Sequence, residues 1–212
     1  MKKTYTKAAV ALIVATTGLQ TTHVVADEMA DTRDNRGWYV GGALSYAEGK
    51  TEAGNVTLLD EEGIGFGVYG GYNFNDWFGL EGSSFQSDNM ANGRAGLDNA
   101  EFFTLSFMPK LTVNFNDSVG VFFKVGPTFV MYTEEYNDYD GYYYWDDEFD
   151  WSEVILGAGV GTEVKIQDGV KLRLSYDYVS GNLDENWYDW DAPNERVDVT
   201  LGRFALGVHY QF

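Results

Sequence analysis

The sequence contains no cysteine and only two histidines among its 212 residues. Without cysteine the chain can form no disulfide, no heme thioether and no thiolate metal site. His209 is the only histidine after residue 26, and no His-x-Ser arrangement, Gly-x-Ser-x-Gly motif or nucleotide-binding loop accompanies it. A polar position inside the fold is a simpler explanation for His209 than a catalytic base. We therefore expect no enzymatic activity.

Long hydrophobic runs and basic residues are also scarce. After residue 26 no stretch approaches the ~20 consecutive apolar residues that a membrane helix needs, so any entry into a membrane must use strands. The chain has 14 basic against 33 acidic residues and a formal net charge of −19. A chain this acidic is not expected to bind nucleic acid or anionic headgroups by general electrostatic attraction.

The first 26 residues have the pattern of a secretory signal peptide. Lys2, Lys3 and Lys7 form a cationic start, residues 8–14 are apolar, and Val24-Val25-Ala26 offers small residues for a signal peptidase. The apolar part is too short to span a bilayer. We expect a signal peptide at residues 1–26 and one domain at residues 27–212.

Apolar residues alternate with small or polar ones through most of the remaining chain. In the last segment Phe204, Leu206, Val208, Tyr210 and Phe212 form one face of a strand, and Ala205, Gly207, His209 and Gln211 form the other. The same two-residue period predicts eight strands, near residues 38–46, 64–74, 78–85, 103–113, 121–132, 156–165, 170–178 and 201–212. Changes in the alternation near Phe85 and Gly202 predict β-bulges there.

Short and long connections alternate between these strands. Tight turns are predicted at residues 75–76, 116–118 and 167–169, and long links at residues 48–63, 88–100, 134–152 and 180–196. Strict alternation is typical of an up-and-down antiparallel meander with all long links at one end.

The positions of the charges indicate which face meets lipid. Charged residues lie within strands on the small, polar face, which is also rich in glycine: Glu81, Lys110, Lys124, Glu163, Arg173 and Asp177. A cation facing mid-bilayer lipid costs about 2–4 kcal/mol, and none of these cations is on the apolar face. The pattern predicts an all-β fold, an eight-stranded antiparallel up-and-down transmembrane β-barrel with the apolar face outward. The alternative is a soluble periplasmic lipocalin-like carrier with that face inside.

The chain after residue 26 resembles the small OmpA-like and OmpX-like eight-stranded outer-membrane barrels of Gram-negative bacteria. The similarity is carried by the signal peptide, Trp38-Tyr39-Val40-Gly41-Gly42, Phe78-Gly79-Leu80-Glu81-Gly82, Lys124-Val125-Gly126 and the terminal Tyr210-Gln211-Phe212. It covers the barrel and not the periplasmic peptidoglycan-binding domain of OmpA. It implies a location in the outer membrane, contact with lipid and lipopolysaccharide, and recognition of Gly207, Tyr210 and Phe212 by the barrel-assembly machinery.

The resemblance also implies a role for the interior charges, because in this family interior salt bridges block or gate a narrow water path. The matching positions are Glu81, Lys110, Lys124, Glu163 and Arg173, with Asp177 and Arg203 as outer members. A structural plug without gating is the simpler interpretation. The pairing of acids with bases cannot be read from the sequence.

Most of the acidic residues fall in the long links, where the third link interleaves them with aromatic residues. The candidates for surface contact are Tyr139, Asp140, Tyr143, Trp145, Asp146 and Asp147. An acidic surface favours a cationic external ligand or a host surface partner, and it could also bind Ca²⁺ or Mg²⁺ weakly. A solvated, repulsive surface is the alternative. No residue set predicts a firm metal site, and no cofactor is expected.

The sequence thus predicts a non-enzymatic outer-membrane barrel that supports the membrane and exposes acidic, aromatic loops. A narrow channel for ions or small solutes, gated by the interior salt bridges, is the alternative function.

Overall fold

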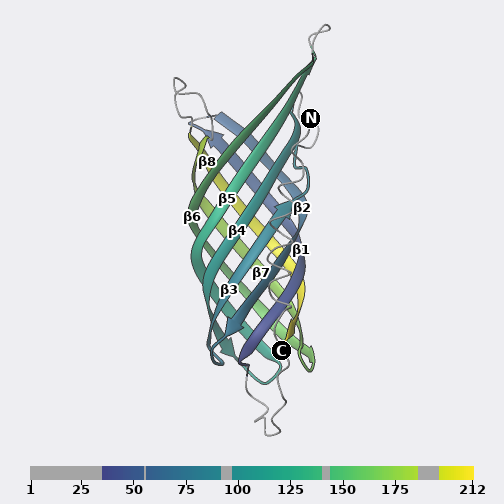
Figure 1. The fold of residues 1–212 in the computed structure, drawn as a ribbon, viewed down its shortest axis with the longest axis vertical. Helices are drawn as coiled ribbons and strands as arrows, with labels where there is room; N and C mark the ends of the chain where they lie inside the picture. Colours follow the sequence, from purple (N-terminus) through teal and green to yellow (C-terminus); the bar gives the residue numbers. More distant parts are fainter. Residues whose placement is uncertain (1–34, 55, 92–96, 140–143, 186–195) are drawn as a thin grey trace.

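The computed structural model describes residues 35–54, 56–91, 97–139, 144–185 and 196–212, and their strands close into one antiparallel barrel (Figure 1). The strands are β1 (Gly37–Ala53), β2 (Val56–Asn73), β3 (Phe78–Ser87), β4 (Leu97–Asn114), β5 (Val119–Tyr139), β6 (Tyr144–Gln167), β7 (Val170–Glu185) and β8 (Arg196–Gln211). Each strand pairs with its neighbours in sequence, and β1 pairs with β8. The predicted fold class is confirmed. The predicted signal peptide lies outside the described residues.

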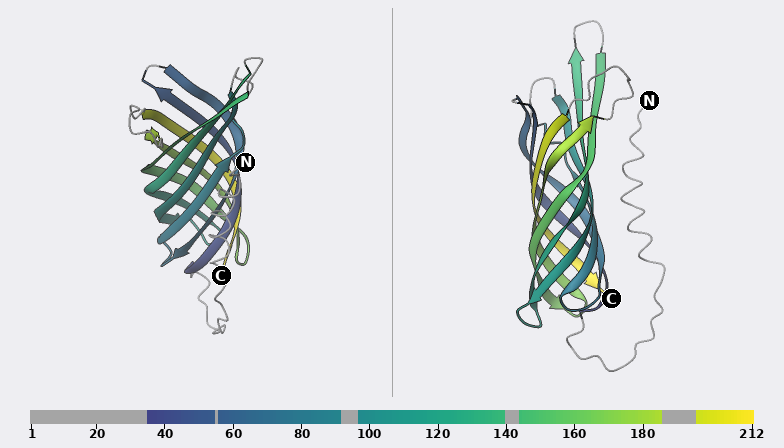
Figure 2. Two further views of the ribbon diagram at one scale, coloured as in Figure 1. Left: turned by 45° about the horizontal axis from the view of Figure 1, so that its top comes forward. Right: turned by 90° about the vertical axis from the view of Figure 1, so that its left-hand side faces the viewer.

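All three predicted tight turns lie at one end of the barrel, which we call the turn end; the C-terminus is there too (Figure 2). Asparagine begins two of these turns. Asn75 Oδ1 accepts hydrogen bonds from the amides of Trp77 and Phe78 at 3.0 and 2.8 Å. Asn116 Oδ1 does the same for Ser118 and Val119, both at 2.8 Å. A short amide side chain can thus replace a backbone partner in the turn.

The opposite end, which we call the hairpin end, differs from the prediction. The links predicted at residues 48–63 and 134–152 are largely strand, because β1 and β2 stay paired from Glu48↔Glu62 to Ala53↔Val56, and β5 and β6 stay paired to Tyr139↔Tyr144. Both links were therefore predicted too long. The two-residue alternation continues in the β1–β2 ladder, but the apolar residues are now on the inner face. Leu59 faces inward, whereas charged residues face outward. This change of face concealed the strand pattern in the sequence.

The two predicted bulges are also wrong. Phe85 pairs with Gly67 and Thr104 in an unbroken register, and Gly202 pairs with Glu48 and Tyr178 in the same way. The apparent change of period has another cause. Phe85 and Leu201 keep the alternation and point into the barrel, where both are buried.

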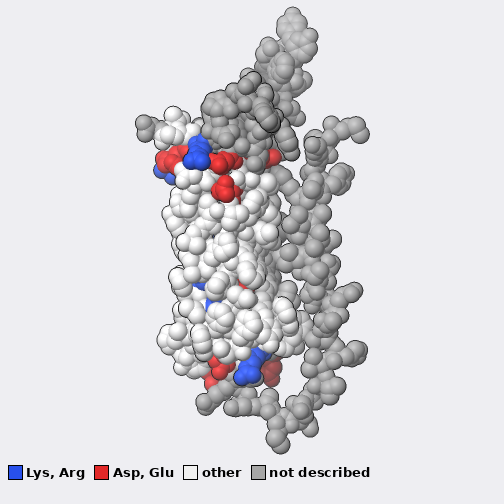
Figure 3. Space-filling view, turned by 60° about the vertical axis from the view of Figure 1, so that its left-hand side comes forward, with Lys and Arg blue, Asp and Glu red and all other residues white. Residues whose placement is uncertain are grey.

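The outer surface carries a broad apolar belt. Leu44, Ile64 and Leu156 are 75%, 66% and 69% exposed, and each has further exposed apolar residues beside it on its own strand. On the face shown in Figure 3, charged side chains gather at the two ends, and the band between them shows only a few small patches of charge. An outward apolar face is what a lipid-embedded barrel needs, and it contradicts the lipocalin-like alternative.

Among the described residues, no helix is long and apolar enough to cross a membrane.

Candidate functional site

Arg173 on β7 is the centre of a charged network inside the barrel. Its Nη2 atom lies 2.7 Å from Glu81 Oε2 on β3 and 2.6 Å from Glu163 Oε1 on β6. Arg173 Nε also donates to Glu163 Oε1 at 3.2 Å. All three side chains are buried. Glu163 and Arg173 are paired directly across β6 and β7, whereas Glu81 reaches Arg173 across the lumen.

The other four predicted interior charges join the same network. Lys110 Nζ on β4 lies 3.2 Å from Glu163 Oε1. Lys124 Nζ on β5 bridges Glu81 Oε1 at 3.0 Å and Asp177 Oδ1 at 2.8 Å. Arg203 Nη2 on β8 lies 2.9 Å from Asp177 Oδ2. Hence the structure brings all seven predicted residues together, which satisfies the requirement that buried charges be paired.

Three aromatic side chains that sequence reasoning did not single out surround the charges. Tyr39 donates its hydroxyl hydrogen to Glu81 Oε2 at 2.8 Å, and Lys110 Nζ lies 4.3 Å from the Tyr39 ring centre. The Arg173 guanidinium carbon lies 4.2 Å from the Tyr69 ring centre and 4.4 Å from that of Phe122. These distances suit cation–π contacts. The sequence signal that could have identified Tyr39, Tyr69 and Phe122 is their position on the small, polar face of their strands.

His209 is buried beside these rings as an interior polar residue, and its Nδ1 atom lies 3.3 Å from the Tyr69 hydroxyl.

Glycine provides the space for this layer. A Cβ atom at Gly159 would lie 2.6 Å from Lys124 Cε, closer than real Cβ atoms approach a neighbour. The long lysine side chain therefore fills the volume that a side chain at Gly159 would occupy. Glycine at this position thus accommodates a long neighbouring side chain.

Toward the hairpin end, the lumen is filled by an apolar core that the sequence reasoning missed. The rings of Phe102 and Tyr132 stack with centres 4.7 Å apart, and Tyr132 stacks on Trp151 at 5.6 Å. The remaining members of this apolar core are Ala47, Leu59, Phe85, Met90, Ala91, Ala100, Val130, Val179, Leu183, Val197, Val199 and Leu201. The alternation predicts that the large apolar residues face outward. At this end they face inward.

Two small cavities lie in the lumen beside the charged network. One cavity of about 20 Å³ lies beside Glu81, Lys124 and Arg203, and one of about 30 Å³ lies beside Thr104, Thr128 and Arg203. Each holds only one or two water molecules. The charged network and the apolar core thus lie at two successive levels of the lumen.

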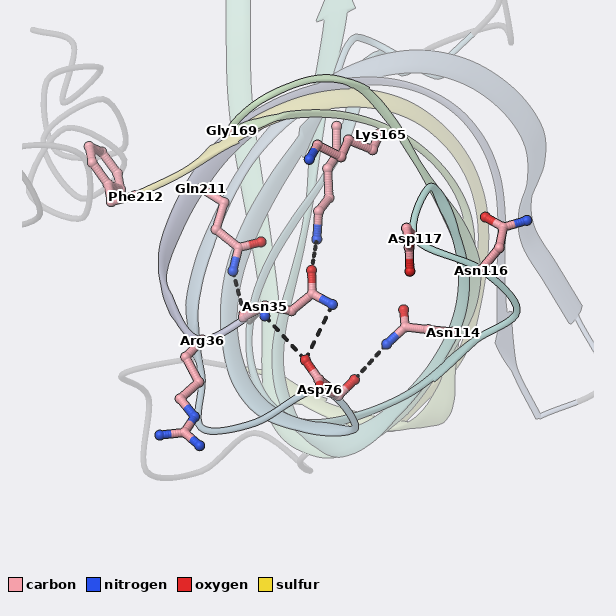
Figure 4. Close-up of a pocket in the computed structure, with 11 residues that line it drawn as sticks. Asn35, Arg36, Asp76, Asn114, Asn116, Asp117, Lys165, Gly169, Gln211 and Phe212 are labelled. Atoms are coloured by element: carbon pink, nitrogen blue, oxygen red, sulfur yellow. Dashed lines mark hydrogen bonds between the residues drawn. The ribbon is translucent and has the colours of Figure 1, made fainter. Parts of the chain in front are cut away.

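The turn end opens into a polar pocket of about 330 Å³. In Figure 4, Asn35 lies across this pocket and is bonded to Asp76 and Gln211. Lys171 Nζ donates to Asn35 Oδ1 at 3.1 Å and lies 4.0 Å from Glu163 Oε2, so this mouth is continuous with the charged network.

The three residues of the predicted assembly signal lie on or beside β8. Tyr210 is half exposed on the outer face, and its ring contacts that of Phe212 at 5.2 Å. The Phe212 amide donates to the Trp38 carbonyl at 2.9 Å. A Cβ atom at Gly207 would lie 2.9 Å from the Gly42 carbonyl oxygen, so the β1–β8 seam is tight there. Recognition by the assembly machinery stays a prediction.

Four of the six predicted surface-contact residues lie at the described end of the β5–β6 hairpin. Tyr139, Trp145, Asp146 and Asp147 belong to its paired backbone, but their side chains are outside the described part of the structure. Asp140 and Tyr143 lie outside the described residues entirely. Within the described ranges, no three His, Asp or Glu side chains are grouped as a metal site. Weak Ca²⁺ or Mg²⁺ binding at the acidic tips stays a prediction.

Comparison with known proteins gave one family and several similar folds. The family model for the outer membrane protein beta-barrel domain matches residues 9–212. Neisserial surface protein A superposes with a TM-score of 0.58 at 15% identity, covering 82% of this chain and 97% of its own. Ail of Yersinia pestis gives 0.52 at 20% identity, with 84% and 99% covered. OprG of Pseudomonas aeruginosa gives 0.52 at 11% identity, with 85% and 98% covered. A comparison with curated proteins found no match.

Proposed function

The chain belongs to the outer membrane protein beta-barrel family, and from this premise we propose that it is a non-enzymatic barrel whose closed lumen supports the outer membrane and whose hairpin end makes external contacts. The outer membrane is its location. In this family the short turns face the periplasm and the long strands rise outside the cell.

The filled lumen is the observation that carries the proposal. A pore needs a continuous water path, and here the charged network and the apolar core lie one above the other. The cavities left in the described lumen hold no more than one or two waters each. A barrel filled in this way stiffens the membrane without passing solutes.

Single-channel conductance of the refolded protein in a planar bilayer tests the closed lumen. We expect no openings from the wild type, and none from Glu81→Ala, because the apolar core is still closed when the charged network is weakened. Asp168→Asn, in the exposed turn after β6, is the matched control for removing an acid. Discrete wild-type openings would refute the closed barrel.

A narrow channel gated by the ion pairs is the second candidate, and one feature favours it. Lys124 is shared by two carboxylates, as is Arg173, so the pairs can exchange without leaving a charge alone. Openings seen in Glu81→Ala but not in Asp168→Asn would establish this candidate in place of the first.

For the external contact, the acidic surface favours a cationic partner. On the outside of β1, β2 and β8, the exposed acids Glu48, Asp60 and Asp198 continue the acidic composition of the hairpin tips. An Ail structure contains the heparin analogue sucrose octasulfate. A polyanion of that kind would be repelled by acids, so we expect a basic protein or peptide here.

Binding of polylysine to cells that display the protein tests this part. We expect Glu48→Gln/Asp60→Asn and, separately, Asp146→Asn/Asp147→Asn to weaken binding at low salt. High salt should remove the difference, because it screens exposed charges. Asp117→Asn/Asp168→Asn, at the turn end, is the control. Equal binding by all four proteins would contradict a role for the hairpin end.

A further inference from the structure

The buried charged layer has a surplus of one positive charge. Its cations are Lys110, Lys124, Arg173 and Arg203, and its carboxylates are Glu81, Glu163 and Asp177. Lys171, 4.0 Å from Glu163 at the turn end, increases the surplus. Each of these cations contacts a carboxylate, but the carboxylates are shared, so one more anion would balance the charge of the layer.

Arg203 is the member of this layer whose hydrogen bonds are incomplete. Its carboxylate partner, Asp177, is shared with Lys124, which also contacts Glu81. Arg203 Nε is buried and has no hydrogen-bond partner. The rest of its environment is apolar on one side, where the guanidinium carbon lies 4.6 Å from the Phe85 ring centre. One strong donor is therefore left over inside the barrel.

Arg203 also lines a cavity of about 20 Å³. Its charged lining is Arg203, Lys124 and Arg173 against Glu81 and Asp177, so cations again outnumber carboxylates by one. Its hydroxyl lining is Ser45, Ser83, Ser84 and Ser175. Serine hydroxyls and guanidinium N–H groups both donate hydrogen bonds, and the volume suits one particle of about the size of water.

We propose that this cavity binds one halide-sized monovalent anion, chloride in ordinary salt, which completes the charge balance of the lumen. Arg203 holds the ion, and the serines supply further donors. Larger anions are excluded by the size of the cavity. A single water molecule is the competing occupant, and it differs from an anion because it brings no charge.

Refolding at constant ionic strength distinguishes the two occupants. The protein is folded into detergent micelles in sodium gluconate, with chloride replacing gluconate in steps, and unfolded in urea. Since an ion that binds only the folded state stabilises it, the urea midpoint should rise with chloride. Arg203→Gln should abolish this rise, and Arg196→Gln, an exposed arginine paired with Asp184 at 2.8 Å, should retain it. A midpoint independent of chloride would leave water as the occupant and overturn the proposal.

A second measurement does not require the variant to fold. Crystals of the wild-type protein grown in sodium bromide should show an anomalous diffraction peak between Arg203 and Ser45. Ordinary density without an anomalous signal at that position would identify water. A chloride effect that persists in Arg203→Gln would also overturn the proposal, because it would place the ion elsewhere.

Discussion

Lys110 and Lys124 are directly opposed across the β4–β5 ladder, yet their ammonium groups bind different carboxylates. Lys110 Nζ lies 3.2 Å from Glu163, and Lys124 Nζ lies 3.0 Å from Glu81. Two like charges opposite each other in a sheet repel. Here each finds an acid on another strand, and Arg173 joins the two acids. The network is therefore interdependent across the lumen.

Removing one shared acid should be costly. Glu81→Gln keeps the shape but leaves Arg173 and Lys124 each short of a counter-charge, and we expect a loss of about 3–5 kcal/mol of unfolding free energy. Urea unfolding in detergent micelles measures the loss. Asp168→Asn is the control: Lys165 lowers the pKa of Asp168, but the pair is exposed, and we expect a small effect. Similar losses in both variants would contradict an interdependent network.

Tyr39 should contribute in two separable ways. Tyr39→Phe removes the hydrogen bond to Glu81 but keeps the ring under Lys110, and we expect a loss of about 1.5–3 kcal/mol, as for a hydrogen bond to a charged group. Tyr39→Leu should lose more, because the cation–π contact goes too. The same urea titration measures both. If the two substitutions cost the same, the ring contributes nothing through Lys110.

Alternation along the strands predicted the barrel, the strand order and six of the interior charges, and the family resemblance added Arg203. The pairing of those charges was not predictable. Glu81 and Arg173 belong to β3 and β7, which are not neighbours, so no register relates them. Their contact depends on side-chain length and on the width of the lumen, which glycines such as Gly159 determine.

The sequence reasoning failed at the hairpin end for one physical reason. It treated the large apolar face as the outer face everywhere, which holds only where the outside is lipid. Above the membrane the outside is water, so Leu201 and Phe102 turn inward while Glu48 and Asp60 turn outward. The same inversion suggested bulges near Phe85 and Gly202 and concealed the outer parts of β1 and β2.

The apolar core at the hairpin end should be sensitive to truncation. Phe102→Ala leaves a cavity between Tyr132 and its neighbours, and we expect a loss of about 3–5 kcal/mol of unfolding free energy. Phe107→Ala is the matched control on the same strand. Phe107 is 58% exposed on the outer face, where detergent can fill the gap, so it should cost less. A larger loss of unfolding free energy for Phe107→Ala than for Phe102→Ala would indicate that the outer face, and not the interior, stabilises the barrel.

Substitution of Gly49 gives a second test of this core, because its effect depends on contact with one side chain. Gly49 is buried, and the three atoms nearest to an added Cβ all belong to the Phe102 ring, with Cζ at 3.1 Å. Gly49→Ala should therefore destabilise the barrel, since a filled interior cannot absorb an extra methyl group. Phe102→Leu, which shortens the opposing side chain, should recover part of the loss when combined with Gly49→Ala.

Gly42→Ala is the control, because its Cβ would meet only the Gly67 carbonyl oxygen, at 3.7 Å. Urea midpoints of the four variants measure these effects. If the losses caused by Gly49→Ala and Phe102→Leu add in the double variant, Phe102 does not fill the space above Gly49. The packing described for the hairpin end would then be incorrect.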